Sequence, residues 1–186
     1  LKKIYFFLPF YLRSFLETII SKLDNTVVRD FINKPYGSLY NINRSDRMRV
    51  YKRLIRILRN VDSGTSIQVL LTLIIQIFSI PPNKPGCIVE CGCFKGASTA
   101  ALSIAAYLTN RKLYVYDSFE GLPNAEIDQK RIYPHLKIYG YYKKGMYKAQ
   151  LEEVKDNIKL FGESSQTFFI KGFFEKTLPQ HKDKIV

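Results

Sequence analysis

Hydrophobic residues recur at two different spacings along this chain, and the spacing changes near Gly86. Before that point apolar side chains fall three and four positions apart, which is the spacing of one helix face. Three helices are therefore predicted: an amphipathic one within residues 1–23 after the break at Pro9, one over residues 45–59, and an apolar one over residues 66–80. Residues 24–44 show no sustained period and predict a loop or linker.

The ends of these helices follow from capping chemistry. Ser45 or Asp46 can cap the helix over residues 45–59, since each has a short polar side chain that accepts a hydrogen bond from free backbone N–H groups. Pro81 and Pro82 end the apolar helix, because proline cannot continue the backbone hydrogen-bond ladder.

Beyond Gly86, short apolar runs alternate with helical stretches. Strands are predicted at residues 87–91, 113–116 and 167–170, with helices at residues 98–108 and 146–161. Alternating strands and helices indicate βαβ units, so the expected fold class is α/β, with a Rossmann-like parallel sheet preceded by N-terminal helices. Residues 124–144 interrupt the pattern for longer than an ordinary connection, and we expect a functional segment there, on the substrate side of the sheet.

Charge changes this picture mainly in the N-terminal third. Residues 1–60 hold 13 basic and 4 acidic residues, out of 29 and 16 in the whole chain. Such a bias attracts phosphates, anionic lipid heads or acidic substrates, and a solvated basic face without any partner is at least as common. Residues 1–23 are therefore a candidate for contact with a membrane surface, while no nucleic-acid partner is expected.

The chain carries no convincing signal for secretion or for a membrane span. Pro9 interrupts the first apolar stretch, and no small-residue cleavage site follows it. The apolar run over residues 67–80 is short of the roughly 20 residues that a bilayer requires. Cys87, Cys91 and Cys93 lack the spacing of a metal site and fit the thiols of a reducing cytoplasm. The predicted location is the cytoplasm, with membrane association left open.

The strongest chemical signal is a glycine loop between the first predicted strand and its helix. Glu90 ends the strand, Gly92 and Gly96 follow, and Ser98 and Thr99 open the helix. Gly92 allows a tight turn and the close approach of a ligand, and Gly96 permits close packing of strand and helix. The hydroxyl groups lie at a helix N-terminus, where free N–H groups favour a carboxylate or phosphate.

This loop is not the G-x-G-x-x-G fingerprint of dinucleotide-binding proteins, because three residues separate its glycines. The looser spacing disfavours NAD and suits the amino-acid end of S-adenosylmethionine (SAM). On the glycines alone, an ordinary turn between strand and helix remains an equal alternative.

Asp117 ends the second predicted strand, 21 residues after Gly96. An acidic side chain at that place lies over the first loop and can accept hydrogen bonds from both ribose hydroxyls of an adenosine cofactor. The alternative role for Asp117 is that of a turn or helix-capping residue. Agreement between the glycine loop and Asp117 favours a cofactor that contains adenosine.

Three blocks of the sequence resemble the TylF-type macrocin O-methyltransferase family: Ile88–Thr99, Tyr114–Pro123 and Lys171–Pro179. The resemblance covers about residues 45–186 and does not reach residues 1–40. It implies a class I SAM-dependent methyltransferase. It further implies that residues 45–186 are a partial methyltransferase domain whose C-terminal part is missing. The charge and apolar spacing, rather than the resemblance, define residues 1–44 as a basic and apolar N-terminal segment with a linker.

The resemblance also assigns roles to single residues. The methionine end of SAM would be lined by Glu90, Gly92, Gly96 and Ser98, and its ribose would be held by Asp117. The adenine would be bordered by Ser118 and Phe119, and closed in by Gly172 and Phe174. The family also binds a divalent metal, expected to be Mg²⁺, through acidic residues that would lie downstream of Val186, so no metal ligand is expected in this chain.

The expected function is SAM-dependent transfer of a methyl group to a hydroxyl of a sugar or glycosylated metabolite. His135 could act as the base or orient the acceptor, although an exposed loop histidine is the more common case. The alternatives are a nucleotide-dependent Rossmann oxidoreductase and a non-catalytic module at a membrane surface; oligomer formation is open. Because part of the sheet and the metal carboxylates are expected beyond Val186, we expect little or no activity from these 186 residues alone.

Overall fold

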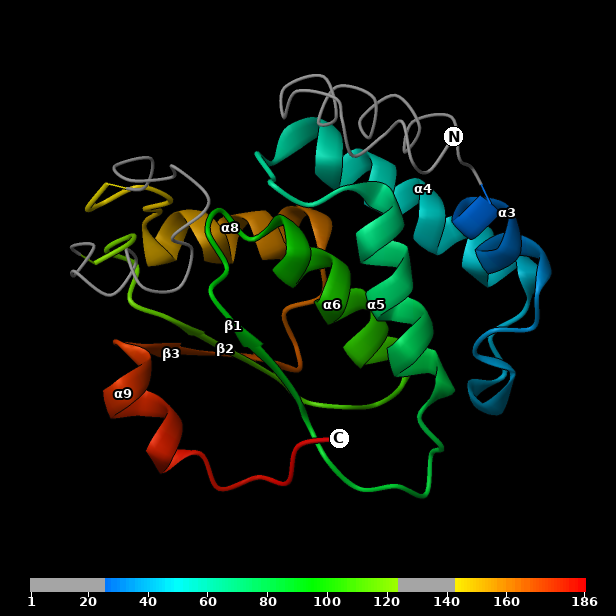
Figure 1. Ribbon diagram of the computed structural model, residues 1–186. Helices are drawn as coiled ribbons and strands as arrows, with labels where there is room; N and C mark the ends of the chain where they lie inside the picture. Colours follow the sequence, from blue (N-terminus) through cyan, green and yellow to red (C-terminus); the bar gives the residue numbers. More distant parts are fainter. Residues whose placement is uncertain (1–25, 124–142) are drawn as a thin grey trace, which may run out of the picture.

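The computed structural model describes residues 26–123 and 143–186, and its centre is a three-stranded parallel sheet (Figure 1). The strands lie in the order β1 (Ile88–Cys91), β2 (Leu113–Asp117), β3 (Thr167–Lys171). In register, Leu113 of β2 lies between Ile88 of β1 and Thr167 of β3. Since all three strands run in the same direction, the loops that follow them meet at one edge of the sheet. The predicted α/β class with a parallel sheet is confirmed.

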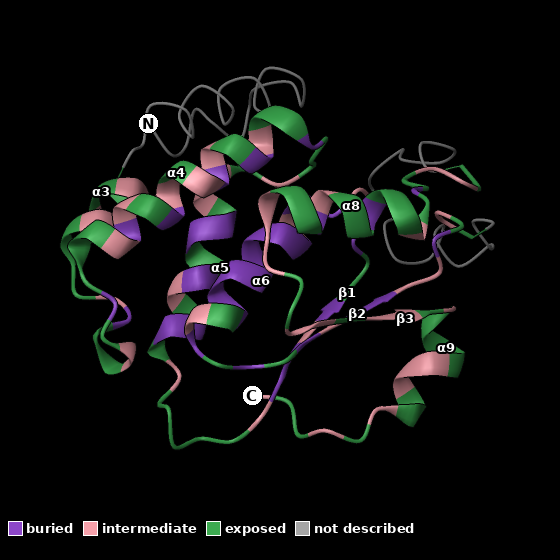
Figure 2. Cartoon of the chain, turned by 180° about the vertical axis from the view of Figure 1, so that it is seen from behind, coloured by how far each residue is buried: buried purple, intermediate pink, exposed green. Residues whose placement is uncertain are grey.

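Most of the helices lie on one side of this sheet, as Figure 1 shows for α4 (Arg44–Asn60), α5 (Ile67–Ser79), α6 (Ala97–Leu108) and α8 (Leu151–Phe161). Figure 2 shows that burial is concentrated in α5, α6 and the first two strands. Helix α6 is the innermost, and its small side chains, such as Ala100 and Ala105, are fully buried. Small residues let α6 contact α4, α5, α8 and β2 at once.

Residues 26–43 contain helices where the sequence predicts a loop. Helix α3 (Thr26–Asn33) is followed by the short 3₁₀ helix η1 (Ser38–Tyr40). Phe31 of α3 is fully buried and stacks on Phe78 of α5, with ring centroids 6.3 Å apart. The predicted loop is wrong for this stretch, because tertiary packing stabilises a helix too short to be evident from its own periodicity. Residues 1–25 lie outside the described part of the chain, so the helix within residues 1–23 stays a prediction.

Helix α4 begins one residue earlier than predicted and has a different cap. The side chain of Asn43 accepts hydrogen bonds from the backbone N–H groups of Ser45 and Asp46, at 2.8 and 3.1 Å. Asp46 in turn accepts from the N–H of Asn43, at 2.9 Å. The prediction of Ser45 or Asp46 as the cap is therefore wrong. Asp46 instead occupies the third helical position and completes a capping box with Asn43.

Two further helices test the predicted boundaries. Helix α5 lies within the predicted residues 66–80, and Ser66 is its cap rather than its first helical residue. Helix α8 begins at Leu151 rather than Met146, because the preceding residues form a turn in which Tyr147 has a left-handed φ of 59°. Among the helices of residues 26–123 and 143–186, none is long and apolar enough to cross a membrane.

After β3 the chain crosses the other face of the sheet through α9 (Phe174–Thr177) and η2 (Leu178–Gln180) (Figure 1). His181 Nδ1 and the hydroxyl of Tyr116 share a hydrogen bond of 2.7 Å, and Asp183 accepts one of 2.7 Å from Tyr114. These contacts guide Ile185 to a parallel pairing with Cys87, on the side of β1 away from β2. The strand order therefore reverses at β1. The contact of His181 with Tyr116 anchors this crossing.

Candidate functional site

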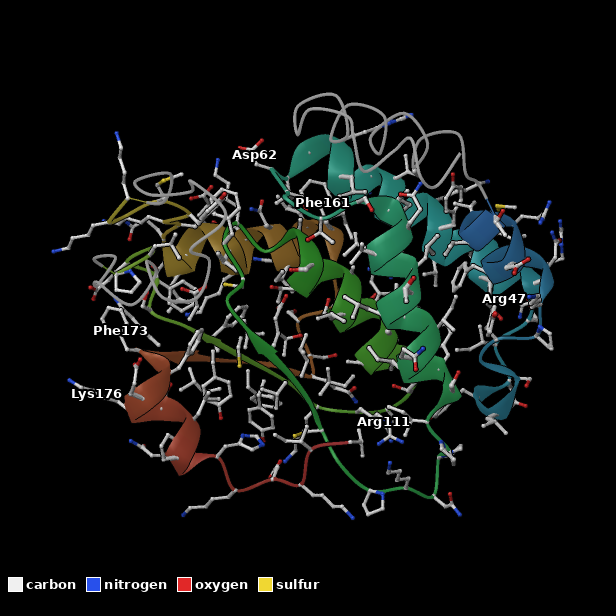
Figure 3. All side chains as sticks on the ribbon, in the orientation of Figure 1. Arg47, Asp62, Arg111, Phe161, Phe173 and Lys176 are labelled. Carbon is white, nitrogen blue, oxygen red and sulfur yellow. The ribbon has the colours of Figure 1, made fainter. Side chains whose placement is uncertain are left out.

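A pocket of about 470 Å³, here called the main pocket, lies at the edge where the strands end. Its walls are the loops after β1, β2 and β3 and the turn before α8. It is lined by Cys91, Gly92, Phe94, Asp117, Ser118, Gly121, Leu122, Pro123, Tyr147, Gly172, Phe173, Phe174 and Glu175. In Figure 3, Phe173 marks this end of the sheet and Arg111 marks the opposite end. A parallel sheet binds ligands at this edge, where the strand order reverses.

Asp117 joins the loops that form the main pocket. Its Oδ2 atom accepts a hydrogen bond of 2.7 Å from the N–H of Cys93, in the glycine loop. Its Oδ1 atom accepts one of 2.8 Å from the N–H of Phe119, and its backbone carbonyl accepts one of 2.9 Å from Gly172. Each carboxylate oxygen can accept more than one hydrogen bond, so Asp117 retains capacity for ligand hydroxyls. The structure thus places Asp117 over the first loop, as predicted.

Glu90 is buried beneath the glycine loop and bonded to helix α6. Its two carboxylate oxygens accept hydrogen bonds of 2.6 Å from the hydroxyls of Ser98 and Thr99. Burial, with a smaller contribution from the nearby Asp117 carboxylate, raises the pKa of Glu90 to about 7, against the opposing effect of the two hydroxyls. Glu90 therefore does not line the main pocket. It fixes the start of α6 relative to the end of β1.

The two glycines of the loop have left-handed backbones but different surroundings. Gly92 has a φ of 85°, and a Cβ atom added there would meet nothing within 4 Å. Gly96 has a φ of 87°, and an added Cβ would lie 2.9 Å from Cγ1 of Val154 in α8. Gly92 is thus open to a ligand, whereas Gly96 allows α8 to pack closely against the loop. Gly96 was predicted to permit close packing of the strand against its own helix, whereas the atoms that crowd it in the structure belong to α8.

The remaining predicted residues divide between the pocket and the core. Ser118, Gly172 and Phe174 line the main pocket. Phe119 does not: its side chain is 4% exposed and belongs to the hydrophobic core, although its N–H group binds Asp117. The assignment of Phe119 to the border of an adenine stays a prediction, and the burial of its side chain leaves its backbone as the part nearest to the main pocket's Ser118. His135 lies outside the described residues.

A second pocket of about 280 Å³, here called the side pocket, adjoins the first. It is lined by Asp62, Ser63, Gly64, Thr65, Gly92, Cys93, Phe94, Ala97, Ser98 and Tyr147. Ser98, which the sequence places near the methionine end of SAM, therefore faces this side pocket. The N-terminus of α6 borders the same space, and its free N–H groups favour an anionic group there.

Several lining residues were missed by the sequence analysis. Phe173 and Glu175 lie beside the predicted residues Gly172 and Phe174. The block over residues 171–179 therefore indicated this segment of the chain but not these two residues. The loop over residues 62–65 carried a weaker signal, the Ser63–Gly64 break between two helices. Tyr147 had no local signal, because only the folding of the turn before α8 brings it to the pockets.

Within residues 26–123 and 143–186, no group of three His, Cys, Asp or Glu side chains is arranged to hold a metal ion. Cys87 and Cys93 are buried, and Cys91 is exposed at the main pocket. Burial raises the pKa of all three thiols, so the thiolate form is disfavoured. The described part of the chain thus contains a ligand pocket without a metal centre.

Comparison with known proteins identifies similar enzymes. The chain is 32% identical over 99 residues to the 8-demethyl-8-(2,3-dimethoxy-alpha-L-rhamnosyl)-tetracenomycin-C 4'-O-methyltransferase of Streptomyces olivaceus; the match covers 51% of this chain and 37% of the relative. Among solved structures, 73% of the chain aligns with 48% of the O-methyltransferase NovP, at 19% identity and a TM-score of 0.45. The same share aligns with 61% of the calicheamicin methyltransferase CalS11, at 16% identity and a TM-score of 0.40.

The chain thus spans little more than a third of the length of the curated relative that it matches. Its sequence matches that of the macrocin O-methyltransferase (TylF) family over residues 73–186, which include β1, β2, β3 and every residue of the main pocket. Since this match takes in more than half of the chain, the protein belongs to the macrocin O-methyltransferase (TylF) family.

Proposed function

We propose that this chain carries the SAM-binding part of an O-methyltransferase that acts on a hydroxyl of a sugar or glycosylated metabolite. The observation that carries the proposal is Asp117, held over the glycine loop by the N–H of Cys93 at the carboxyl edge of a parallel sheet. The family match favours methyl transfer over a nicotinamide-dependent oxidoreductase. The Streptomyces relative, whose name specifies a rhamnosyl compound, supports a glycosylated acceptor.

In this proposal the two pockets share the cofactor. The main pocket takes the nucleoside, with Asp117 accepting hydrogen bonds from the ribose hydroxyls and Gly172 and Phe174 beside the adenine. The side pocket takes the amino-acid end, whose carboxylate would lie near Ser98 and the N-terminus of α6. Glu90 and Gly96 act indirectly, by fixing α6 and α8 against the loop.

When bound, SAM supplies a methyl group whose bond to sulfur breaks as a new bond to the acceptor oxygen forms. The chain's own residues would contribute mainly by alignment, because the two reacting centres must be held in line. Removal of the hydroxyl proton needs a base, and His135 remains the candidate proposed from the sequence. No described cluster fits Mg²⁺, so no step of the proposal is routed through a metal. Contact of residues 1–23 with a membrane surface, and oligomer formation, also remain predictions.

Titration calorimetry of this 186-residue chain tests the proposal. SAM and its product S-adenosylhomocysteine (SAH) should bind in a one-to-one ratio, and NAD⁺ should not compete. A longer chain that continues beyond Val186 should then transfer labelled methyl groups from SAM to glycosylated acceptors. Binding of NAD⁺ in place of SAM, or failure of both SAM and SAH to bind, would refute the cofactor assignment.

A further inference from the structure

Two aromatic residues form the wall between the main pocket and the side pocket. Of the residues that line the two pockets, Gly92, Phe94 and Tyr147 are common to both. The rings of Phe94 and Tyr147 meet edge to face, with centroids 5.5 Å apart and an interplanar angle of 89°. A ligand that occupies both pockets must therefore pass these two rings.

Gly92 is the third residue that lines both pockets. Because no atom lies within 4 Å of the position of a Cβ at Gly92, a ligand can approach the backbone there. The boundary that the two pockets share thus consists of open glycine backbone and two aromatic side chains. Neither a charged nor a hydrogen-bonding side chain is common to the linings of both pockets, apart from the hydroxyl of Tyr147.

Both aromatic residues adopt backbone conformations that bulky side chains usually avoid. Phe94 has a φ of 48° and Tyr147 a φ of 59°, in the left-handed region. Such a conformation is unfavourable for a residue with a Cβ atom, and it persists only where the surrounding structure imposes it. The surrounding structure therefore holds both rings at the boundary that the two pockets share.

The ring of Phe94 already lies beside a positive charge. The ammonium group of Lys95 lies 5.8 Å from the centroid of the Phe94 ring. It is also paired at 2.6 Å with the carboxylate of Asp62, so its charge is locally balanced. The π face of an aromatic ring attracts a cation, most strongly where water is excluded.

Resting on the proposed function, we propose that the rings of Phe94 and Tyr147 form the contact surface for the positively charged sulfonium of SAM. The nucleoside and the amino-acid end of SAM are joined through this sulfur. When they occupy the main and side pockets respectively, the sulfonium lies at the wall that the two rings form. The product SAH has the same two ends but a neutral sulfur. The two rings should therefore increase the preference for SAM over SAH, compared with aliphatic side chains at the same positions.

The test measures the dissociation constants of SAM and SAH by titration calorimetry for this chain and for the variants Phe94→Leu and Tyr147→Leu. The quantity compared is the ratio of the SAM constant to the SAH constant. Each leucine variant should raise this ratio about three- to tenfold, as the loss of one cation–π contact predicts. A loss of folded protein scales both constants equally and leaves the ratio unchanged, so partial unfolding does not mimic the effect.

Two controls separate the ring from other causes. Tyr147→Phe keeps the ring and should keep the ratio of the two dissociation constants. Tyr107→Leu removes an exposed tyrosine of α6 that lines neither pocket, so it should also leave this ratio unchanged. The inference is overturned if both leucine variants weaken SAM and SAH by the same factor, or if Tyr147→Phe changes the ratio as much as Tyr147→Leu. Absence of SAM and SAH binding in the unmodified chain would instead refute the proposed function.

Discussion

Two carboxylates on neighbouring strands, Glu90 and Asp117, serve the same loop through different contacts. Glu90 is 9% exposed and accepts hydrogen bonds from hydroxyls of α6. Asp117 reaches the main pocket and accepts from backbone N–H groups of two loops. One carboxylate therefore belongs to the scaffold, and the other is available to a ligand.

Replacing Asp117 tests its contact with the ribose. Asp117→Ala should weaken SAH binding by one to two orders of magnitude, about 1.4 kcal/mol per tenfold, because charge-assisted hydrogen bonds are lost. Asp183→Ala removes a carboxylate from the opposite face of the sheet and should leave the affinity unchanged. Calorimetry on both variants provides the comparison. An unchanged affinity in Asp117→Ala would remove the ribose assignment.

The pKa of Glu90 predicts how stability depends on pH. The pKa is about 7 in the folded chain and 4.5 for an unperturbed glutamate, so the folded state binds this proton more tightly than the unfolded state. The resulting stabilisation is complete below about pH 4.5 and is lost as pH rises through 7, by about 3 kcal/mol at most. Urea unfolding between about pH 5 and 8 should show this fall in the wild type and a flatter profile in Glu90→Gln. Parallel profiles for the two proteins would contradict the prediction.

At the scale of elements, the glycine loop separates binding from packing. Gly92 follows β1 beside open space, and Gly96 precedes α6 where α8 leaves no space for a side chain. Helix α8 in turn contacts α6 and α4. In this loop Gly92 thus borders the two pockets, and Gly96 packs against the helical layer.

The two alanine variants of this loop should therefore fail in different ways. Both introduce a Cβ at a left-handed φ, which costs about 1 kcal/mol. Gly96→Ala adds a clash with Val154 and should lose roughly 2–4 kcal/mol of unfolding free energy in total. Gly92→Ala should lose only the smaller amount but weaken SAM binding at least tenfold, because the new methyl group enters the ligand's space. If the two variants lost the same unfolding free energy and the same SAM affinity, the separate roles of Gly92 and Gly96 would be refuted.

At the scale of the whole molecule, Arg111 connects segments far apart in the sequence. The residue is 6% exposed, and its guanidinium donates to the carbonyls of Pro81, Lys84 and Gly86 and to the hydroxyl of Tyr40, at 3.0 to 3.1 Å. It thereby fixes the connection between α5 and β1 to the start of β2, at the end of the sheet away from the pockets (Figure 3). A planar fork with five donors suits several carbonyls at once.

Removing this guanidinium should destabilise the chain without altering the site. Arg111→Met leaves three carbonyl groups without their donor, and the free energy of unfolding should fall by about 2–4 kcal/mol. Arg111→Lys should recover little, because one ammonium cannot reach these acceptors in the same directions. Urea denaturation measures the loss, and SAH affinity measured below the unfolding transition should match the wild type. A matching loss of affinity would show that Arg111 also positions the site.

The local pattern of the sequence determined most of the helices and strands, and two parts of the candidate site: the glycine loop and Asp117. Apolar spacing predicted β1, β2, β3 and helices α4, α5 and α6 to within one or two residues, and helix α8 except for its start at Leu151. Helices α4, α5 and α8 bury one face at helical spacing, whereas α6 is a short apolar run that is buried on nearly all sides. The glycine loop and Asp117 were likewise evident, since each follows directly from a strand whose end the sequence predicts.

Only the tertiary structure decided which of these residues line the two pockets. The hydroxyl of Ser98 was engaged by Glu90, and the ring of Phe119 turned into the core, through contacts that no local pattern encodes. Helix α3 is stabilised by Phe31 against α5, and Tyr147 reaches the pockets from beyond a long segment of chain. Such contacts join residues distant in sequence, and their free energy depends on the shape of the folded surface rather than on neighbouring residues.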